Sequence, residues 1–148
     1  MPAIPEQRDP YILARYGGEK PPAPDWFTPA IETAPERSFF TSDGANIELL
    51  TWGERGLPGL LFVHGNGAHA DWWSHIAPQF SEHWRCAAFS FSGMGCSDRR
   101  PGGYTIPDLA RETLGAVSAA GLDAGPAAPI VIGHSFGGSI ALEAAVMD

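Results

Sequence analysis

The sequence lacks several features that would point to particular classes of protein. Only two of its 148 residues are cysteine, Cys86 and Cys96, which excludes a disulfide-rich scaffold and favours two reduced thiols. It has no run of 18 or more apolar residues, so no membrane span is predicted. The opening residues, Met1–Glu6, contain no apolar signal core, and together with the thiols this leads us to expect a cytoplasmic protein.

Positive charge is also scarce in this chain. Nine Lys and Arg residues stand against 17 Asp and Glu, giving a net charge of −8 at pH 7. The pair Arg99-Arg100 is too short to form a basic patch, so a nucleic-acid partner is not expected. No Cys/His spacing is typical of a metal site, and no cofactor is predicted. The composition, 44% hydrophobic and 18% charged, is that of a globular chain.

The pattern along the chain divides it into two parts. Residues 1–36 are predicted to be a Pro-rich arm with a short helix over about 26–33, capped by Asp25. Residues 37–148 are predicted to form a partial α/β domain, an initial hairpin followed by parallel strands flanked by helices. The expected strands are Arg37–Thr41, Asn46–Trp52, Gly59–Val63, Cys86–Phe91 and Pro129–Ile132, and the longer expected helices are Asp71–Phe80 and Thr105–Ala120.

One motif carries chemistry: Gly133-His134-Ser135-Phe136-Gly137 follows an apolar strand and precedes a helix-compatible run. A Gly-x-Ser-x-Gly sequence in that context is typical of a nucleophile elbow, a sharp strand-to-helix turn. We therefore predict Ser135 as a nucleophile in a strained backbone conformation and the Phe136 N–H as an oxyanion donor. The two flanking glycines are expected where strand and helix approach most closely. The competing interpretation is a chance match in a chain with 18 glycines.

A second segment strengthens this interpretation. The apolar strand ending at Val63 runs into His64-Gly65-Asn66-Gly67. With both motifs, the chain resembles the α/β-hydrolase superfamily over roughly residues 39–147. The resemblance implies the amino-terminal part of an α/β-hydrolase sheet, truncated after the elbow helix. It also implies that the N–H of Asn66 is the second oxyanion donor and that His64 ties down its loop rather than acting as a base.

A third segment, Ser92-Gly93-Met94-Gly95-Cys96-Ser97-Asp98, follows the fourth predicted strand. Many members of the superfamily carry Asp-x-Arg-Gly-x-Gly-x-Ser there, whereas this chain has Ser90 and Ser92 in place of the Asp and Arg. The departure removes the ion pair expected at that loop. His-Gly-Asn also occurs in haloalkane dehalogenases, but these enzymes and the epoxide hydrolases use an aspartate nucleophile, so Ser135 favours acyl chemistry.

The resemblance places the catalytic acid and histidine on later loops, with a lid between them. We therefore expect a missing carboxyl-terminal half of the fold as a partner and no activity from this chain alone. The open edge left beside the fifth strand also predicts poor stability or association. His69 is the one local base considered, and Asp98 is a possible relocated acid that loop polarity explains equally well.

Two functions of different classes follow. The first is a serine hydrolase acting on a small ester or related acyl substrate, through Ser135 and the N–H groups of Asn66 and Phe136. Carbon–carbon bond hydrolysis and acyl transfer use the same catalytic groups, so the sequence does not distinguish these reactions from ester hydrolysis. The second is a non-catalytic α/β-hydrolase-like binding module, or one half of a split protein.

Overall fold

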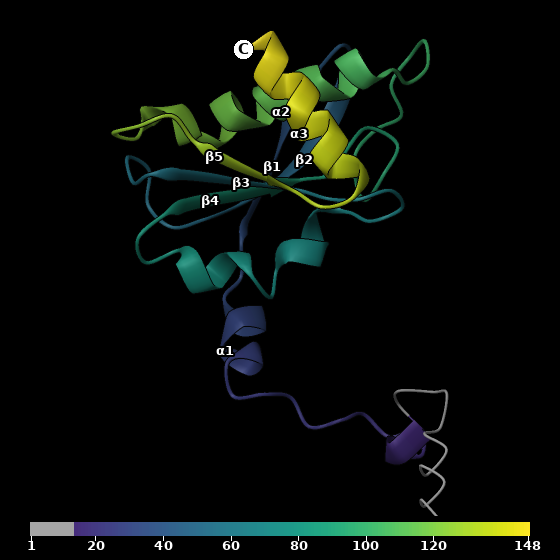
Figure 1. The fold of residues 1–148 in the computed structure, drawn as a ribbon, viewed down its shortest axis with the longest axis vertical. Helices are drawn as coiled ribbons and strands as arrows, with labels where there is room; N and C mark the ends of the chain where they lie inside the picture. The colour runs from purple at the N-terminus through teal and green to yellow at the C-terminus, as the bar shows by residue number, and fades with distance from the viewer. Residues whose placement is uncertain (1–13) are drawn as a thin grey trace, which may run out of the picture.

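A five-stranded mixed sheet forms the centre of the computed structural model, which describes residues 14–148 (Figure 1). The strands are β1 (Glu36–Ser42), β2 (Ala45–Trp52), β3 (Gly59–Val63), β4 (Arg85–Phe89) and β5 (Ile130–Gly133). Their order across the sheet is β1-β2-β4-β3-β5. β2 is antiparallel to both β1 and β4, whereas β4, β3 and β5 run parallel. The predicted hairpin followed by parallel strands is confirmed.

Helices cover the two faces of this sheet. The helical segments are η1 (Ala14–Tyr16), α1 (Phe27–Glu32), η2 (Ala70–Trp73), η3 (Ala77–Phe80), α2 (Ile106–Ala120), η4 (Leu122–Ala124) and α3 (Phe136–Met147), where η marks a 3₁₀ helix. Helices α2 and α3 lie side by side on one face, and η2 and η3 lie on the other (Figure 1). Helix α1 packs next to η3, on the side away from the sheet.

Local sequence signals explain the hairpin and the longest helix. Asp43 and Gly44 make the two-residue turn between β1 and β2, both with positive φ (45° and 83°), which matches the twist of the paired strands. Helix α2 begins with a capping box, in which Thr105 and Asp108 each bind the other's backbone N–H. It ends at Gly121, which adopts the left-handed conformation at φ 69°.

Two predictions about helices are wrong. The segment 71–80 is not one α-helix but two short 3₁₀ helices, η2 and η3. Pro78 lies in the first turn of η3, where its missing N–H costs nothing, whereas in a continuous helix it would remove a hydrogen bond. Asp25 does not cap α1, because the capping position belongs to Trp26 and no side chain accepts a bond there.

The core lies in two layers, one on each face of the sheet. Beneath α2 and α3, Leu49, Val63 and Phe89 pack with Ile140 of α3. On the opposite face the buried cluster consists of Leu50, Trp52, Leu60, Phe62, Ala70, Trp73, Ala77, Cys86 and Ala88. Of the aromatic residues expected in the core here, Trp73 is buried, while Trp72 and Phe80 are 52% and 43% exposed.

The predicted Pro-rich arm falls partly outside the described residues, since its positions 1–13 are not among them. Across residues 14–148, no helix combines the length and the apolar character that crossing a bilayer requires.

Candidate active site

The turn between β5 and α3 holds Ser135 in an unusual backbone conformation. β5 ends at Gly133 and α3 begins at Phe136, and Ser135 between them has φ 53° and ψ −120°. Positive φ in a residue with a side chain costs on the order of 1–3 kcal/mol and persists only where its surroundings enforce it. The predicted strained elbow is therefore confirmed as a backbone feature.

Close contacts explain why this turn needs glycine on both sides of the serine. A Cβ atom on Gly133 would lie 2.5 Å from the Gly137 carbonyl oxygen. A Cβ atom on Gly137 would lie 2.5 Å from the carbonyl oxygens of both Val63 and His64. These are backbone atoms that cannot move aside, so β3, β5 and α3 meet here only because two side chains are absent.

The loop after β3, residues 65–69, packs directly against the elbow; we call it the oxyanion loop after the role predicted for Asn66. Asn66 and Gly67 are the central residues of a turn closed by the Ala68 N–H, which donates to the Gly65 carbonyl at 3.2 Å. A Cβ atom on Gly65 would lie 3.3 Å from the Cβ of Ser135. The structure therefore brings the two sequence motifs together at the carboxyl ends of β3 and β5.

Two backbone N–H groups at this junction are available to a ligand. Within residues 14–148, neither the Asn66 N–H nor the Phe136 N–H donates a hydrogen bond to a protein acceptor. Phe136 is the first residue of the 12-residue helix α3, where N–H groups lack intrahelical partners and the helix dipole is positive. Both Asn66 and Ser135 are exposed. The arrangement can therefore stabilise negative charge beside the Ser135 hydroxyl.

His64 is buried and holds two loops together. Its Nδ1 lies 2.7 Å from the Gly65 carbonyl oxygen, and its Nε2 accepts the Phe91 N–H at 3.1 Å. Because a backbone N–H donates to Nε2, the ring is neutral with its proton on Nδ1. Burial lowers the pKa of His64, while the Gly65 hydrogen bond acts in the opposite direction. The predicted structural role of His64 is confirmed.

The other residues considered as acid or base have different partners. His69 is half-exposed, with its Nδ1 3.5 Å from an Asp71 carboxylate oxygen. His134 stacks on the exposed ring of Trp72, with ring centroids 6.1 Å apart. Asp98 accepts hydrogen bonds from the backbone and side-chain amides of Asn46, at 3.1 and 2.9 Å. Its carboxylate therefore fastens a loop to β2.

Both cysteines are free, as expected. Burial raises the pKa of the Cys86 thiol to about 12, which leaves it unreactive near neutral pH. Cys96 is exposed on the glycine-rich loop after β4. Among residues 14–148, no three His, Cys, Asp or Glu side chains gather closely enough to hold a metal ion.

Buried charges could not be predicted from the sequence. Glu48 of β2 is fully buried and pairs with Arg37 of β1. Arg100 is also buried and binds Glu112 and Asp43, each at 2.8 Å. Strand alternation assigns Glu48 to an exposed face, and a single arginine in a loop carries no signal, so only the assembled fold reveals these pairs.

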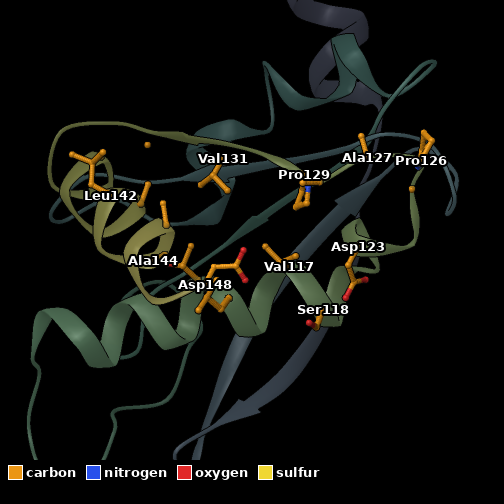
Figure 2. Close-up of a pocket in the computed structure, with 18 residues that line it drawn as sticks. Val117, Ser118, Asp123, Pro126, Ala127, Pro129, Val131, Leu142, Ala144 and Asp148 are labelled. Atoms are coloured by element: carbon orange, nitrogen blue, oxygen red, sulfur yellow. The ribbon is translucent and has the colours of Figure 1, made fainter.

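A hollow of about 840 Å³ lies between α2, α3 and β5, and reaches the elbow at Gly133 and Gly138 (Figure 2). Val117 of α2, Val131 of β5 and Leu142 of α3 give it an apolar lining, and Asp123 and Asp148 also line it. Ser135 and Asn66 are not among the described residues that line it. The hollow marks the uncovered edge of the sheet.

Comparison with known proteins agrees with this geometry. The family described as alpha/beta hydrolase fold matches residues 58–147. RutD of Caulobacter segnis, named as a carbamate hydrolase, is 30% identical over 108 residues, which make up 72% of this chain and 39% of that protein. The esterase Rv0045c of Mycobacterium tuberculosis is 34% identical over 101 residues, 68% of this chain and 32% of that protein.

A solved structure shows the same partial overlap. Epoxide hydrolase A from Mycobacterium thermoresistibile superposes with a TM-score of 0.65 and 26% identity, over 76% of this chain and 35% of that one. The chain thus spans well under half the length of each of these three proteins.

Proposed function

Because the chain belongs to the α/β-hydrolase fold family, we propose that it carries the nucleophile and the oxyanion-binding groups of a serine hydrolase. Ser135 attacks the carbonyl carbon of a small ester or related acyl compound, and the N–H groups of Asn66 and Phe136 bind the carbonyl oxygen. The observation that carries the proposal is the strained Ser135 backbone, φ 53°, with the oxyanion loop packed against it.

The reaction proceeds through an acyl-enzyme. The Ser135 hydroxyl gives its proton to a base as its oxygen bonds the acyl carbon, and the carbonyl oxygen becomes negative. Each N–H aimed at that oxygen is worth about 3–4 kcal/mol of transition-state stabilisation. The leaving group takes the proton as its bond to carbon breaks, and water then cleaves the acyl–serine ester by the same steps in reverse order.

The base and its orienting acid come, in this proposal, from a part of the protein outside these 148 residues. His64 has both ring nitrogens engaged, which prevents it from accepting the Ser135 proton. His134 stacks on Trp72, and His69 faces Asp71. The greater length of the relatives agrees with a carboxyl-terminal half that supplies the remaining groups.

Epoxide hydrolysis is less compatible with this site, although an epoxide hydrolase shares the fold. A carboxylate that opens an epoxide forms an ester, which water can cleave. A serine oxygen at position 135 would form an ether, which water does not cleave under these conditions. Acyl substrates avoid this trap, because attack by serine gives an ester.

A fluorophosphonate probe, which phosphonylates activated serines, tests the proposal. The natural full-length protein, identified by reading the gene past the codon for Asp148, is expected to be labelled at Ser135. The Ser135→Ala variant should lose the label. The matched control is Ser139→Ala, which removes an exposed serine one helical turn along α3 and should label normally.

The outcomes separate the two functions. Labelling that persists in Ser135→Ala, or a full-length protein that does not label at all, would rule out Ser135 as an activated nucleophile. A downstream sequence without an Asp and a His would favour the non-catalytic binding module. Labelling of the 148-residue chain by itself would mean that one of its own residues acts as the base. His69 would then be the first residue to replace in testing which one.

A further inference from the structure

The two residues that directly follow β4, Ser90 and Phe91, hold the oxyanion loop at both of its ends. At its start, the His64 ring accepts the Phe91 N–H at 3.1 Å. At its end, the Ala70 N–H donates to the Ser90 hydroxyl oxygen at 2.9 Å. The two anchoring positions, 90 and 91, are adjacent, so both ends of the short loop that carries Asn66 are held by the same segment just after β4.

The Ser90 hydroxyl is itself fixed by a buried carboxylate. It donates to Oε2 of Glu48 at 2.7 Å, and the same oxygen accepts the Cys96 N–H at 3.0 Å. The other Glu48 oxygen pairs with Arg37, whose second terminal nitrogen binds Asp71 at 2.7 Å. A hydroxyl that both accepts from an amide and donates to a carboxylate has one fixed orientation, and the charged acceptor strengthens the bond.

The backbone leaves room for this relay. Gly95 has φ 52°, and a Cβ atom there would meet the Ser90 hydroxyl and lie 2.8 Å from Oε2 of Glu48. Ser90 also stands where many members of the superfamily carry an aspartate. In this chain the negative charge comes from Glu48 on the neighbouring strand β2 instead. The Ser90 hydroxyl connects that carboxylate to the loop through its two hydrogen bonds.

We propose that Ser90 is a positioning residue: together with Glu48 it fixes the end of the oxyanion loop, and so the Asn66 N–H, against Ser135. The inference rests on the proposed function only in giving that N–H a role in catalysis. The hydrogen-bond relay from Glu48 through Ser90 to Ala70 can be tested without any activity.

The structure supplies a matched control two residues away. Ser92 is also buried on the same segment, but its hydroxyl has no hydrogen-bond partner among the described residues. Ser92→Ala and Ser90→Ala therefore remove the same atom from neighbouring buried sites, one outside the relay and one inside it. Ser90→Thr keeps the hydroxyl and serves as the rescue variant.

The first experiment is residue-resolved amide hydrogen exchange on the full chain. In Ser90→Ala the Ala70 amide should exchange about ten-fold faster or more, because a hydrogen bond in a charged network is lost. Amides of α3 should keep their wild-type rates. Ser92→Ala should match wild type, and Ser90→Thr should return the Ala70 amide toward the wild-type rate.

The proposal is overturned if the Ala70 amide keeps its protection in Ser90→Ala, if Ser92→Ala produces the same change, or if Ser90→Thr restores nothing. Should Ser90→Ala not fold, Glu48→Gln carries the test, because it removes the charge while retaining an acceptor. Faster exchange at Ala70 alone would then support the relay, and unchanged exchange would contradict it.

A second readout addresses catalysis. In the full-length protein, Ser90→Ala should slow fluorophosphonate labelling of Ser135 about ten-fold relative to Ser92→Ala, whereas Ser90→Thr should recover most of the rate. An equal labelling rate in Ser90→Ala and Ser92→Ala would overturn the positioning role. If Ser135 labels in no variant, the proposed function fails, while the exchange result still decides whether the relay exists.

Discussion

At the residue scale, neighbouring glycines of the elbow face very different surroundings. A Cβ atom on Gly137 would lie 2.5 Å from two backbone oxygens, whereas on Gly138 its nearest neighbour would be the Gly133 carbonyl oxygen at 3.4 Å. The first distance is far below any normal contact, and the second is ordinary van der Waals contact. The same substitution should therefore have opposite effects at the two positions.

We expect Gly137→Ala to lower the free energy of unfolding by about 1–3 kcal/mol or more, because β3 and α3 must separate. Gly138→Ala should be neutral or stabilising by up to about 1 kcal/mol, because alanine is the better helix former. Urea denaturation of the two variants beside the wild type measures both. A similar loss in the two variants would show that close approach is not what requires glycine at Gly137.

His64 should make the free energy of unfolding depend on pH. Burial lowers the pKa of His64 below its ordinary value of 6.5. The folded chain therefore keeps the imidazole neutral, whereas the unfolded chain takes up a proton more readily. The contribution of neutral His64 to the free energy of unfolding is fully present above its ordinary pKa. It is lost as the pH falls through the lowered pKa of the folded state. Protonating Nε2 would also break the hydrogen bond from the Phe91 N–H.

The free energy of unfolding should therefore decrease between pH 7 and pH 5, by about 1.4 kcal/mol for each pH unit in which only the unfolded chain is protonated. Urea midpoints across this range provide the measurement. His64→Asn should flatten the dependence, whereas His83→Gln, at an exposed position, should leave it unchanged. An equal slope in His64→Asn and wild type would contradict the assignment.

The residues of the elbow could be predicted from the sequence because their requirement is local. Ser135, Gly133 and Gly137 satisfy a backbone geometry that a five-residue motif encodes. Glu48 and Ser90 could not be predicted, since their partners lie 42 residues apart in sequence and meet only when β2 pairs with β4. Periodicity describes which face a residue occupies and says nothing of a buried ion pair across strands.

At the scale of elements, strands were easier to predict than the connections between them. The bounds of β3 were predicted to the residue, and α2 was marked at both ends by Thr105 and Gly121. The segment 71–80 has helical spacing of its aromatic residues, yet Pro78 divides it. β5 is apolar in sequence, yet Ile130 is 50% exposed, because burial of a strand depends on neighbours that no local pattern describes.

The capping box of α2 should contribute measurably to stability. Thr105→Ala removes the oxygen that accepts the Asp108 N–H and should cost about 1 kcal/mol. Thr105→Ser keeps that oxygen and should cost little. Thermal or urea unfolding of both variants tests this, and equal losses in the two would indicate that the Thr105 methyl group matters rather than the cap.

At the scale of the whole molecule, one edge of the sheet exposes a group of neighbouring apolar residues. Ile130, Val131 and Ile132 of β5 are all exposed, and the neighbouring face of α3 exposes Leu142 (73%) and Val146 (83%). The hollow between α2 and α3 opens beside them (Figure 2). β5 is the last strand of the described sheet, and a strand with one open edge flanked by apolar side chains is a template for pairing with another polypeptide.

We therefore expect the 148-residue chain to associate with increasing concentration. Replacing Leu142 with Lys and Val146 with Glu should shift the population toward monomer, as measured by light scattering coupled to size-exclusion chromatography. Ile31→Lys changes an apolar residue of α1 that is 49% exposed. It is the matched control and should leave the fraction of monomer unchanged. A wild-type chain that stays monomeric at high concentration would contradict association through the edge formed by β5 and α3.

The strained serine of the elbow has a consequence for how such a chain would drift in evolution. Ser135 holds a backbone conformation that suits glycine, so Ser135→Gly should raise the melting temperature above that of Ser135→Ala, by an amount equivalent to about 1 kcal/mol. A lineage released from selection for chemistry would gain stability by accepting glycine at this position. Among descendants of such chains, serine here is expected to persist only where the hydroxyl is still in use.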